Sequence, residues 1–86
     1  MEISLELTLT PLQDDYEMHI INFIKELRKS PFKILENPLS TQIYGSYSEV
    51  MPFVTEAIQK AFSDLDHVLI YMKMVKTDRS SYEPHF

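Results

Sequence analysis

The sequence predicts a single domain of the α+β class, built from four strands and two helices. Apolar residues recur at every second position in some segments and at helical spacing in others, and the two kinds of segment alternate along the chain. The chain has 86 residues, which is the size of one domain. These two observations set the fold class, and each element follows from its own stretch of sequence.

Residues 2–10 have the pattern of a strand with one buried face, and Pro11 ends it. Polar residues occupy the other face. The apolar side consists of Ile3, Leu5, Leu7 and Leu9.

A helix is predicted over residues 14–29. Asp14 and Glu17 have the spacing of a capping box, with Asp in place of the usual Ser or Thr. Pro31 lies just beyond the end of this helix. The apolar residues at helical spacing are Tyr16, Ile20, Phe23, Ile24 and Leu27.

Two strands are predicted over residues 32–36 and 40–45, with Asn37-Pro38 as the turn between them. Gly45, the only glycine of the chain, ends the second of these strands.

The second helix is predicted over residues 48–64, and both Ser46 and Ser48 are possible N-caps. Pro52 occupies the fourth helical position if Ser48 is the cap and the sixth if Ser46 is. A proline costs least near the start of a helix, so the sequence favours Ser48. The apolar stripe comprises Val50, Val54, Ala57, Ile58, Ala61, Phe62 and Leu65.

The last strand is predicted over residues 67–76. Tyr71 and Lys73 lie on one of its faces. The other face carries Val68, Ile70, Met72 and Met74, of which the two methionines are interpreted as core filler. Residues 77–86 are predicted to be a polar tail outside a domain of residues 1–76.

The βαββαβ order has one compact solution, the ferredoxin-like sandwich. Two β-α-β crossovers interleave to give an antiparallel sheet with strand order 4-1-3-2 and both helices on one face. The second and fourth strands then lie at the edges. Pro31 and Pro38 flank the second strand, and Lys73 and Lys76 lie on the fourth, which are features that discourage edge pairing.

Composition excludes several classes of function. The formal net charge is −5, which argues against nucleic acid as a partner because phosphate binding needs clustered Lys and Arg. The chain has no cysteine, hence no disulfide, thiolate metal site or thiol nucleophile, and a reducing cytoplasm is the expected location. No apolar run approaches the length of a membrane span, and no signal peptide is expected.

The sheet face opposite the helices is the predicted ligand site. Glu6 and Thr8 lie on this open face, and Ser40, Gln42 and Tyr44 join it if Ile43 points to the helices. A carboxylate and an amide together match the edge of an aromatic heterocycle with amino and ring-nitrogen groups, and a tyrosine ring offers a stacking surface. A solvated face, or one covered by a partner chain, explains the same residues.

Other chemistry has little support in the sequence. His19, His67 and His85 do not have the spacing of a metal site, so no metal or cofactor is predicted. No motif groups Ser, His and Asp as a catalytic triad. Glu6 remains a possible general base, although a lone carboxylate on a strand is more often a binding or solvated group.

Several stretches resemble the YkoF-like thiamin/hydroxymethylpyrimidine-binding domain. The resemblance runs over residues 3–76, and its most specific part is Pro38-Leu39-Ser40-Thr41-Gln42-Ile43-Tyr44-Gly45. The remaining similar stretches are Leu9-Thr10-Pro11-Leu12 followed by Tyr16, then Ala61-Phe62 and His67-Val68.

The resemblance implies binding of thiamin or its hydroxymethylpyrimidine moiety in a ferredoxin-like domain. It points to Ser40, Thr41 and Gln42 as residues that border the ligand. Some members carry two such domains in tandem, so a single-domain chain is expected to form a homodimer. We therefore predict non-catalytic ligand binding in salvage, transport or sensing of the vitamin. The alternatives are a small enzyme that acts on a related heterocycle and a structural dimerisation module.

Overall fold

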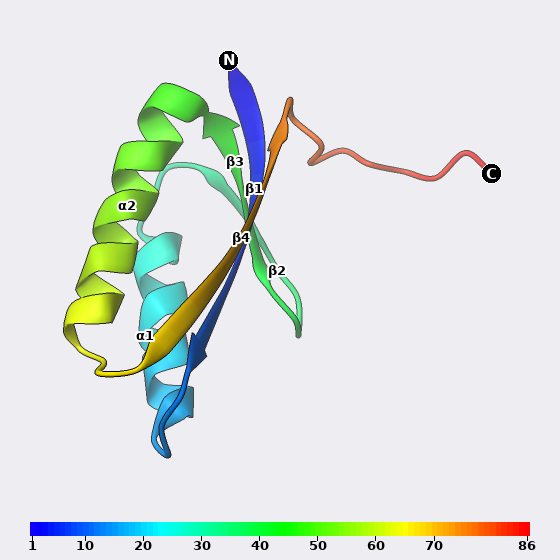
Figure 1. Ribbon diagram of the computed structural model, residues 1–86. Helices are drawn as coiled ribbons and strands as arrows, with labels where there is room; N and C mark the ends of the chain where they lie inside the picture. The colour runs from blue at the N-terminus through cyan, green and yellow to red at the C-terminus, as the bar shows by residue number, and fades with distance from the viewer.

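The computed structural model describes residues 1–86 and has the predicted element order (Figure 1). The elements are β1 (Glu2–Pro11), α1 (Tyr16–Arg28), β2 (Lys33–Glu36), β3 (Thr41–Ser46), α2 (Tyr47–Ser63) and β4 (Val68–Lys76).

The four strands form one antiparallel sheet in the order β2-β3-β1-β4, which confirms the predicted ferredoxin-like topology. Both helices cover the same side of this sheet and leave its other side open (Figure 1). β2 and β4 are the edge strands, as predicted.

The core lies between the helices and the sheet, and β1 contributes most to it. Leu5 and Leu7 are each 1% exposed, and Ile43 of β3 lies opposite Leu5 in register. Because residues that face each other across antiparallel strands share a side of the sheet, Ile43 points to the helices as assumed. The buried apolar residues are Ile3, Leu5, Leu7, Leu9, Phe23, Leu27, Ile43, Val50, Val54, Ala57 and Leu65.

Gly45 marks the point where β3 approaches α2 most closely. A β-carbon at this position would lie 2.9 Å from Val50 Cγ2 and 3.0 Å from Phe32 Cδ1. The absence of a side chain therefore allows β3 to run directly into α2.

Both helix starts differ from the prediction. The N-cap of α2 is Ser46 and not Ser48, because the first helical N–H, of Tyr47, is already satisfied by the Met1 carbonyl at 2.8 Å. Pro52 consequently occupies the sixth position, on an exposed part of the helix.

The capping box predicted for α1 is absent. The N-cap is Asp15 rather than Asp14, and its side chain makes no capping hydrogen bond. The Asp15 carboxylate instead accepts hydrogen bonds from Gln13 and from His19, whose Nε2 is 3.1 Å away. These two hydrogen bonds lower the pKa of Asp15.

The methionines of β4 are not core residues. Met72 and Met74 lie on the helix side of the sheet, as the alternation predicts, yet they are 42% and 40% exposed. Val68 and Ile70, in the first half of β4, pack against the core. Beyond Ile70 the helices lie over β1 and β3 instead of β4. The second half of β4 is therefore uncovered on both faces.

Residues 77–86 form no helix or strand. Thr77 has a φ of 100°, a left-handed conformation that costs a β-branched residue about 1–3 kcal/mol. Its N–H donates to the Glu2 carbonyl at 2.8 Å. The chain thus changes direction directly after β4 and stays hydrogen-bonded to β1 as far as Arg79.

Candidate ligand-binding site

The open face of the sheet carries the polar side of β1. Glu6 lies opposite Gln42 of β3 on one side and opposite Lys73 of β4 on the other. Ser4 lies in the same way between Tyr44 and Val75. Glu6 and Gln42 therefore converge on one face of adjacent central strands, as the sequence predicts.

Gln42 is oriented by Tyr44. The Tyr44 hydroxyl donates to Gln42 Oε1 at 2.7 Å, so that the amide nitrogen of Gln42 has no acceptor in the protein. Burial, followed by the carboxylates of Asp78 and Glu6, raises the pKa of Tyr44. The phenol therefore stays protonated and keeps donating over the whole neutral range.

Glu6 is held from its other side by the turn between β2 and β3. The Ser40 hydroxyl donates to Glu6 Oε2 at 2.9 Å, which leaves Oε1 without a donor. Asn37 orders this turn, because its side-chain oxygen accepts the backbone N–H groups of Leu39 and Ser40 at 2.8 and 2.9 Å. The open face thus presents a free carboxylate oxygen beside a free amide N–H₂.

The six residues predicted for the site fall into two neighbouring hollows. Glu6, Gln42 and Tyr44 line a hollow of about 150 Å³ on the open face. Thr8, Ser40 and Thr41 line another, of about 140 Å³, under the turn between β2 and β3. The Ser40–Glu6 hydrogen bond joins the two hollows, and Thr8 Oγ1 donates to the Leu39 carbonyl at 3.1 Å.

Thr41 lies on the other side of the sheet from Glu6 and Gln42. It is 4% exposed and stands opposite Leu7 in register, so its side chain shares the helix side with that leucine. We therefore leave Thr41 out of the open-face site.

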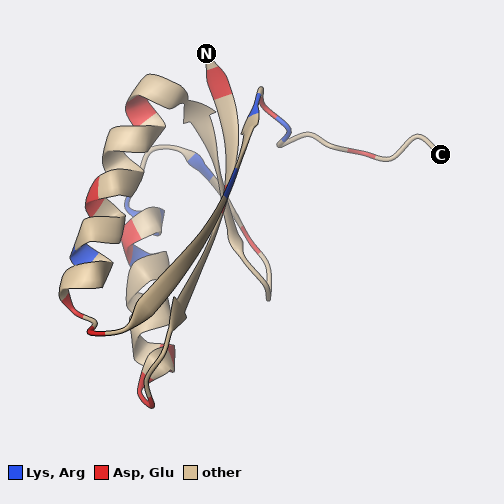
Figure 2. Ribbon diagram, in the orientation of Figure 1, with Lys and Arg blue, Asp and Glu red and all other residues tan.

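Ser4, Lys73 and Val75 line the open-face hollow, although the sequence did not single them out as site residues. Strand alternation alone places them on this face. Their position beside Glu6 depends on the register of β1 against β4, which alternation does not give. Lys and Arg are otherwise dispersed over the molecule rather than gathered in one patch (Figure 2).

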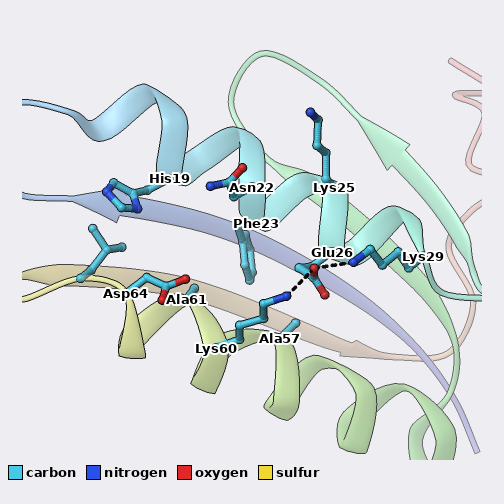
Figure 3. A pocket seen from close by; sticks show the side chains of 11 residues that line it. His19, Asn22, Phe23, Lys25, Glu26, Lys29, Ala57, Lys60, Ala61 and Asp64 are labelled. Carbon is cyan, nitrogen blue, oxygen red and sulfur yellow. Dashed lines mark hydrogen bonds and ion pairs between the residues drawn. The ribbon is translucent and has the colours of Figure 1, made fainter.

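A larger hollow, of about 300 Å³, lies between the two helices (Figure 3). Phe23, Ala57 and Ala61 form its apolar lining. At its rim, Lys29 and Lys60 both donate to Glu26 Oε1, at 2.7 and 2.8 Å, and these hydrogen bonds lower the pKa of Glu26.

The groove between the helices is a second candidate. Glu26 and the two lysines satisfy one another there, but Asn22, Lys25 and Asp64 also line the groove and have no side-chain partner in the protein. On the open face, Glu6 Oε1 and the Gln42 amide are unpartnered and lie opposite each other on adjacent strands. Groups that lack a partner within the protein are the ones available to a ligand.

Two features are absent from the structure. No group of three or more His, Asp or Glu side chains lies close enough together to hold a metal ion. Neither helix has the length and apolar character needed to cross a membrane.

Several solved structures have the same fold, and three of them illustrate the likeness. Protein SP2199 of Streptococcus pneumoniae is 25% identical, with a TM-score of 0.86 over 94% of this chain and 92% of that one. A Thermotoga maritima protein, assigned provisionally to thiamine biosynthesis or salvage, is 15% identical, with a TM-score of 0.81 over 90% and 85% of the two chains. Protein MJ1052 of Methanocaldococcus jannascii is 21% identical, with a TM-score of 0.75 over 95% and 84%.

The sequence comparison is more specific than the structural one. No curated protein matches this chain. The family model described as thiamine-binding protein, however, matches residues 5–84, which include β1 from Leu5, every later element and most of the tail. The chain belongs to this family of thiamine-binding proteins.

Proposed function

We propose that the open face binds thiamin or its hydroxymethylpyrimidine moiety without altering it, in salvage, transport or sensing of the vitamin. The observation that carries this proposal is the pair of unpartnered groups on adjacent strands, Glu6 Oε1 and the Gln42 amide nitrogen.

These two groups match the edge of an aminopyrimidine. The exocyclic amine of such a ring is a donor, and the neighbouring ring nitrogen is an acceptor. Glu6 supplies an acceptor and Gln42 a donor. Directly opposite residues have β-carbons about 4.5–5.5 Å apart, a spacing that lets both reach one ring edge. The hydrogen bond to the ionised carboxylate is charge-assisted and therefore the stronger of the two.

The lining of the hollow supports binding rather than turnover. It contains no histidine and no carboxylate other than Glu6. The Ser4 hydroxyl donates to the Thr77 carbonyl at 2.7 Å and accepts the Arg79 N–H at 2.8 Å, so it is not free to act as a nucleophile. Neither a paired acid and base nor an activated nucleophile is assembled here.

The size of the hollow supports a homodimer. About 150 Å³ is half the lower end of the usual range for ligand pockets, roughly 300–1,000 Å³. The same face exposes the apolar side chains Leu69, Tyr71 and Val75, at 46%, 62% and 36%. A second copy packed on this face would cover these residues and supply the missing wall of the site.

Isothermal titration of the protein with thiamin, and separately with hydroxymethylpyrimidine, tests the proposal. We expect saturable binding of at least one of them and, by mass spectrometry, recovery of the ligand unchanged. Conversion of the ligand would favour the enzyme with Glu6 as base. Absence of binding by both ligands would leave the structural dimerisation module as the better account.

A further inference from the structure

The C-terminal tail begins at the rim of the open-face hollow. Ser4, which lines the hollow, holds the tail by its hydrogen bonds to the Thr77 carbonyl and the Arg79 N–H. The Asp78 carboxylate is close enough to Tyr44, another lining residue, to raise its pKa. The start of the tail is therefore fixed against the residues of the site.

Beyond this anchor the tail stands away from its own domain. Figure 1 shows it running outward on the side of the sheet opposite to the helices. Its two aromatic side chains are unburied, with Tyr82 70% and Phe86 96% exposed. Past Arg79 its contacts are local. The Ser80 N–H donates to Asp78 Oδ1 at 2.8 Å, the Tyr82 N–H donates to the Arg79 carbonyl at 3.2 Å, and the rings of His85 and Phe86 meet edge to face.

The tail nevertheless belongs to the pattern of the family. The thiamine-binding model extends to residue 84, well past the last strand, which ends at Lys76. The part of the tail beyond Arg79 matches the family model as far as residue 84, yet it contacts only the tail itself, and we therefore expect its packing partner to lie elsewhere. The face from which it projects is also the one with exposed apolar residues and an incomplete pocket.

We propose that the tail of one copy crosses to a second copy of this chain and closes the partner's open-face hollow with Tyr82. The inference rests on the proposed ligand site for its functional meaning. Its structural content, an exchange of tails between two facing sheets, stands independently of any ligand.

The dimensions agree with this arrangement. Sheets packed face to face are about 10 Å apart. The exchange requires the Arg79–Tyr82 turn to open, after which the three residues from Arg79 to Tyr82 span about 10 Å in extended form. The aromatic ring therefore reaches the partner sheet, where Tyr71 and Val75 offer apolar contacts. A two-fold axis makes both exchanges equivalent, so each copy gives one tail and receives one.

Disulfide trapping tests the exchange without a ligand, because the chain has no cysteine of its own. Single variants Tyr82→Cys and Val75→Cys are mixed and oxidised, and the cross-linked product is identified by mass spectrometry. Tyr82→Cys mixed with Met18→Cys is the matched control, since Met18 is 65% exposed on α1, on the helix side of the molecule. We expect the 82–75 product to form several times faster than the 82–18 product.

The double variant Tyr82→Cys/Val75→Cys separates exchange from closure within one chain. Exchange predicts a covalent dimer of this variant. An internal disulfide in a product of single-chain mass would overturn the proposal, as would equal rates for the 82–75 and 82–18 products. Because no vitamin is present, these outcomes do not depend on whether the open face binds thiamin.

Discussion

The two faces of β1 differ in almost every property although their residues alternate along one strand. Leu5 and Leu7 are each 1% exposed against the helices, while Glu6 between them lies on the open face and is held only by Ser40. The leucines gain stability from burial and are interchangeable with other apolar residues of similar volume. Glu6 lies outside the buried core, and its place in the proposed ligand site depends on its charge and hydrogen-bonding capacity. The helix face thus specifies the fold, and the open face is available for function.

Leu5→Ala is expected to have the largest effect on stability. Truncating a buried leucine removes about 2–5 kcal/mol of unfolding free energy, a large share of what a domain of this size has. Urea denaturation measures this loss. The control on the open face is Glu2→Ala, at an exposed position of the same strand, which should change stability by about 0.5 kcal/mol or less. Similar losses of unfolding free energy in both variants would mean that the two faces do not differ in their contribution to stability.

Glu6→Gln is expected to have the largest effect on binding. It keeps the shape of the side chain and removes a charge-assisted hydrogen bond of about 1.5–3 kcal/mol, so affinity should fall by roughly 10–100-fold. Titration calorimetry with hydroxymethylpyrimidine measures this change. Glu26→Gln, the same substitution in the groove between the helices, is the matched control and should leave affinity unchanged. A larger loss in Glu26→Gln would move the site to that groove.

Gly45→Ala tests the packing between β3 and α2 on the helix face, at a position that has no room for a side chain. The added methyl would lie within 3.0 Å of Phe32 and Val50, and overpacking of this kind costs about 1–3 kcal/mol. Thermal unfolding should show a lower midpoint. An unchanged midpoint would mean that β3 and α2 can separate without loss.

Tyr44→Phe should weaken binding less than Glu6→Gln does. The phenol does not need to touch the ligand, because it acts by holding Gln42 Oε1. Loss of this neutral hydrogen bond, worth about 0.5–1.5 kcal/mol, should lower affinity by roughly 2–10-fold. The matched variant Tyr47→Phe, in the first turn of α2, is expected to bind as the parent does. Equal effects of the two variants would remove Tyr44 from the site.

The smallest expected effect is a pH dependence at Glu26. The hydrogen bonds from Lys29 and Lys60 lower the pKa of Glu26 below its usual 4.5. The contribution of this group to stability is therefore present above pH 4.5 and is lost as pH falls through the lowered value. The stability difference between the parent and Glu26→Gln should be constant near neutrality and shrink below pH 4.5. A difference that grows in acid would contradict this assignment.

The fold was predictable because its signals are local and repeated. The leucines of β1 and the apolar stripe of α2 each recur over several residues, and the βαββαβ order leaves one compact arrangement. The position of the α2 N-cap could not be predicted from the local sequence around Ser48. The first helical N–H, of Tyr47, donates to the carbonyl of Met1, which is far away in sequence. Met72 and Met74 have the period of core residues, and only the placement of the helices leaves them exposed.

The site was predictable in part for the same reason. The alternation of polar and apolar residues along the strands is enough to place Glu6, Gln42 and Tyr44 on the open face. The roles of Ser40 and Tyr44 as the groups that hold Glu6 and Gln42 depend on contacts across the sheet and along β3 that no pattern reveals. Thr41 lies within the segment that resembles the family. Because side chains alternate along β3, however, Thr41 points to the helix side while Gln42 points to the open face.

The side-chain amide signals of Gln42 and Asn22 give the most direct test of which face binds the ligand. Gln42 lines the open-face hollow and Asn22 lines the groove between the helices, so each reports on one site. In a ¹⁵N-labelled protein titrated with hydroxymethylpyrimidine, the Gln42 N–H₂ resonances should shift progressively to saturation while those of Asn22 stay fixed. A saturable shift of Asn22 with an unmoved Gln42 would contradict the claim that the open face is the binding face.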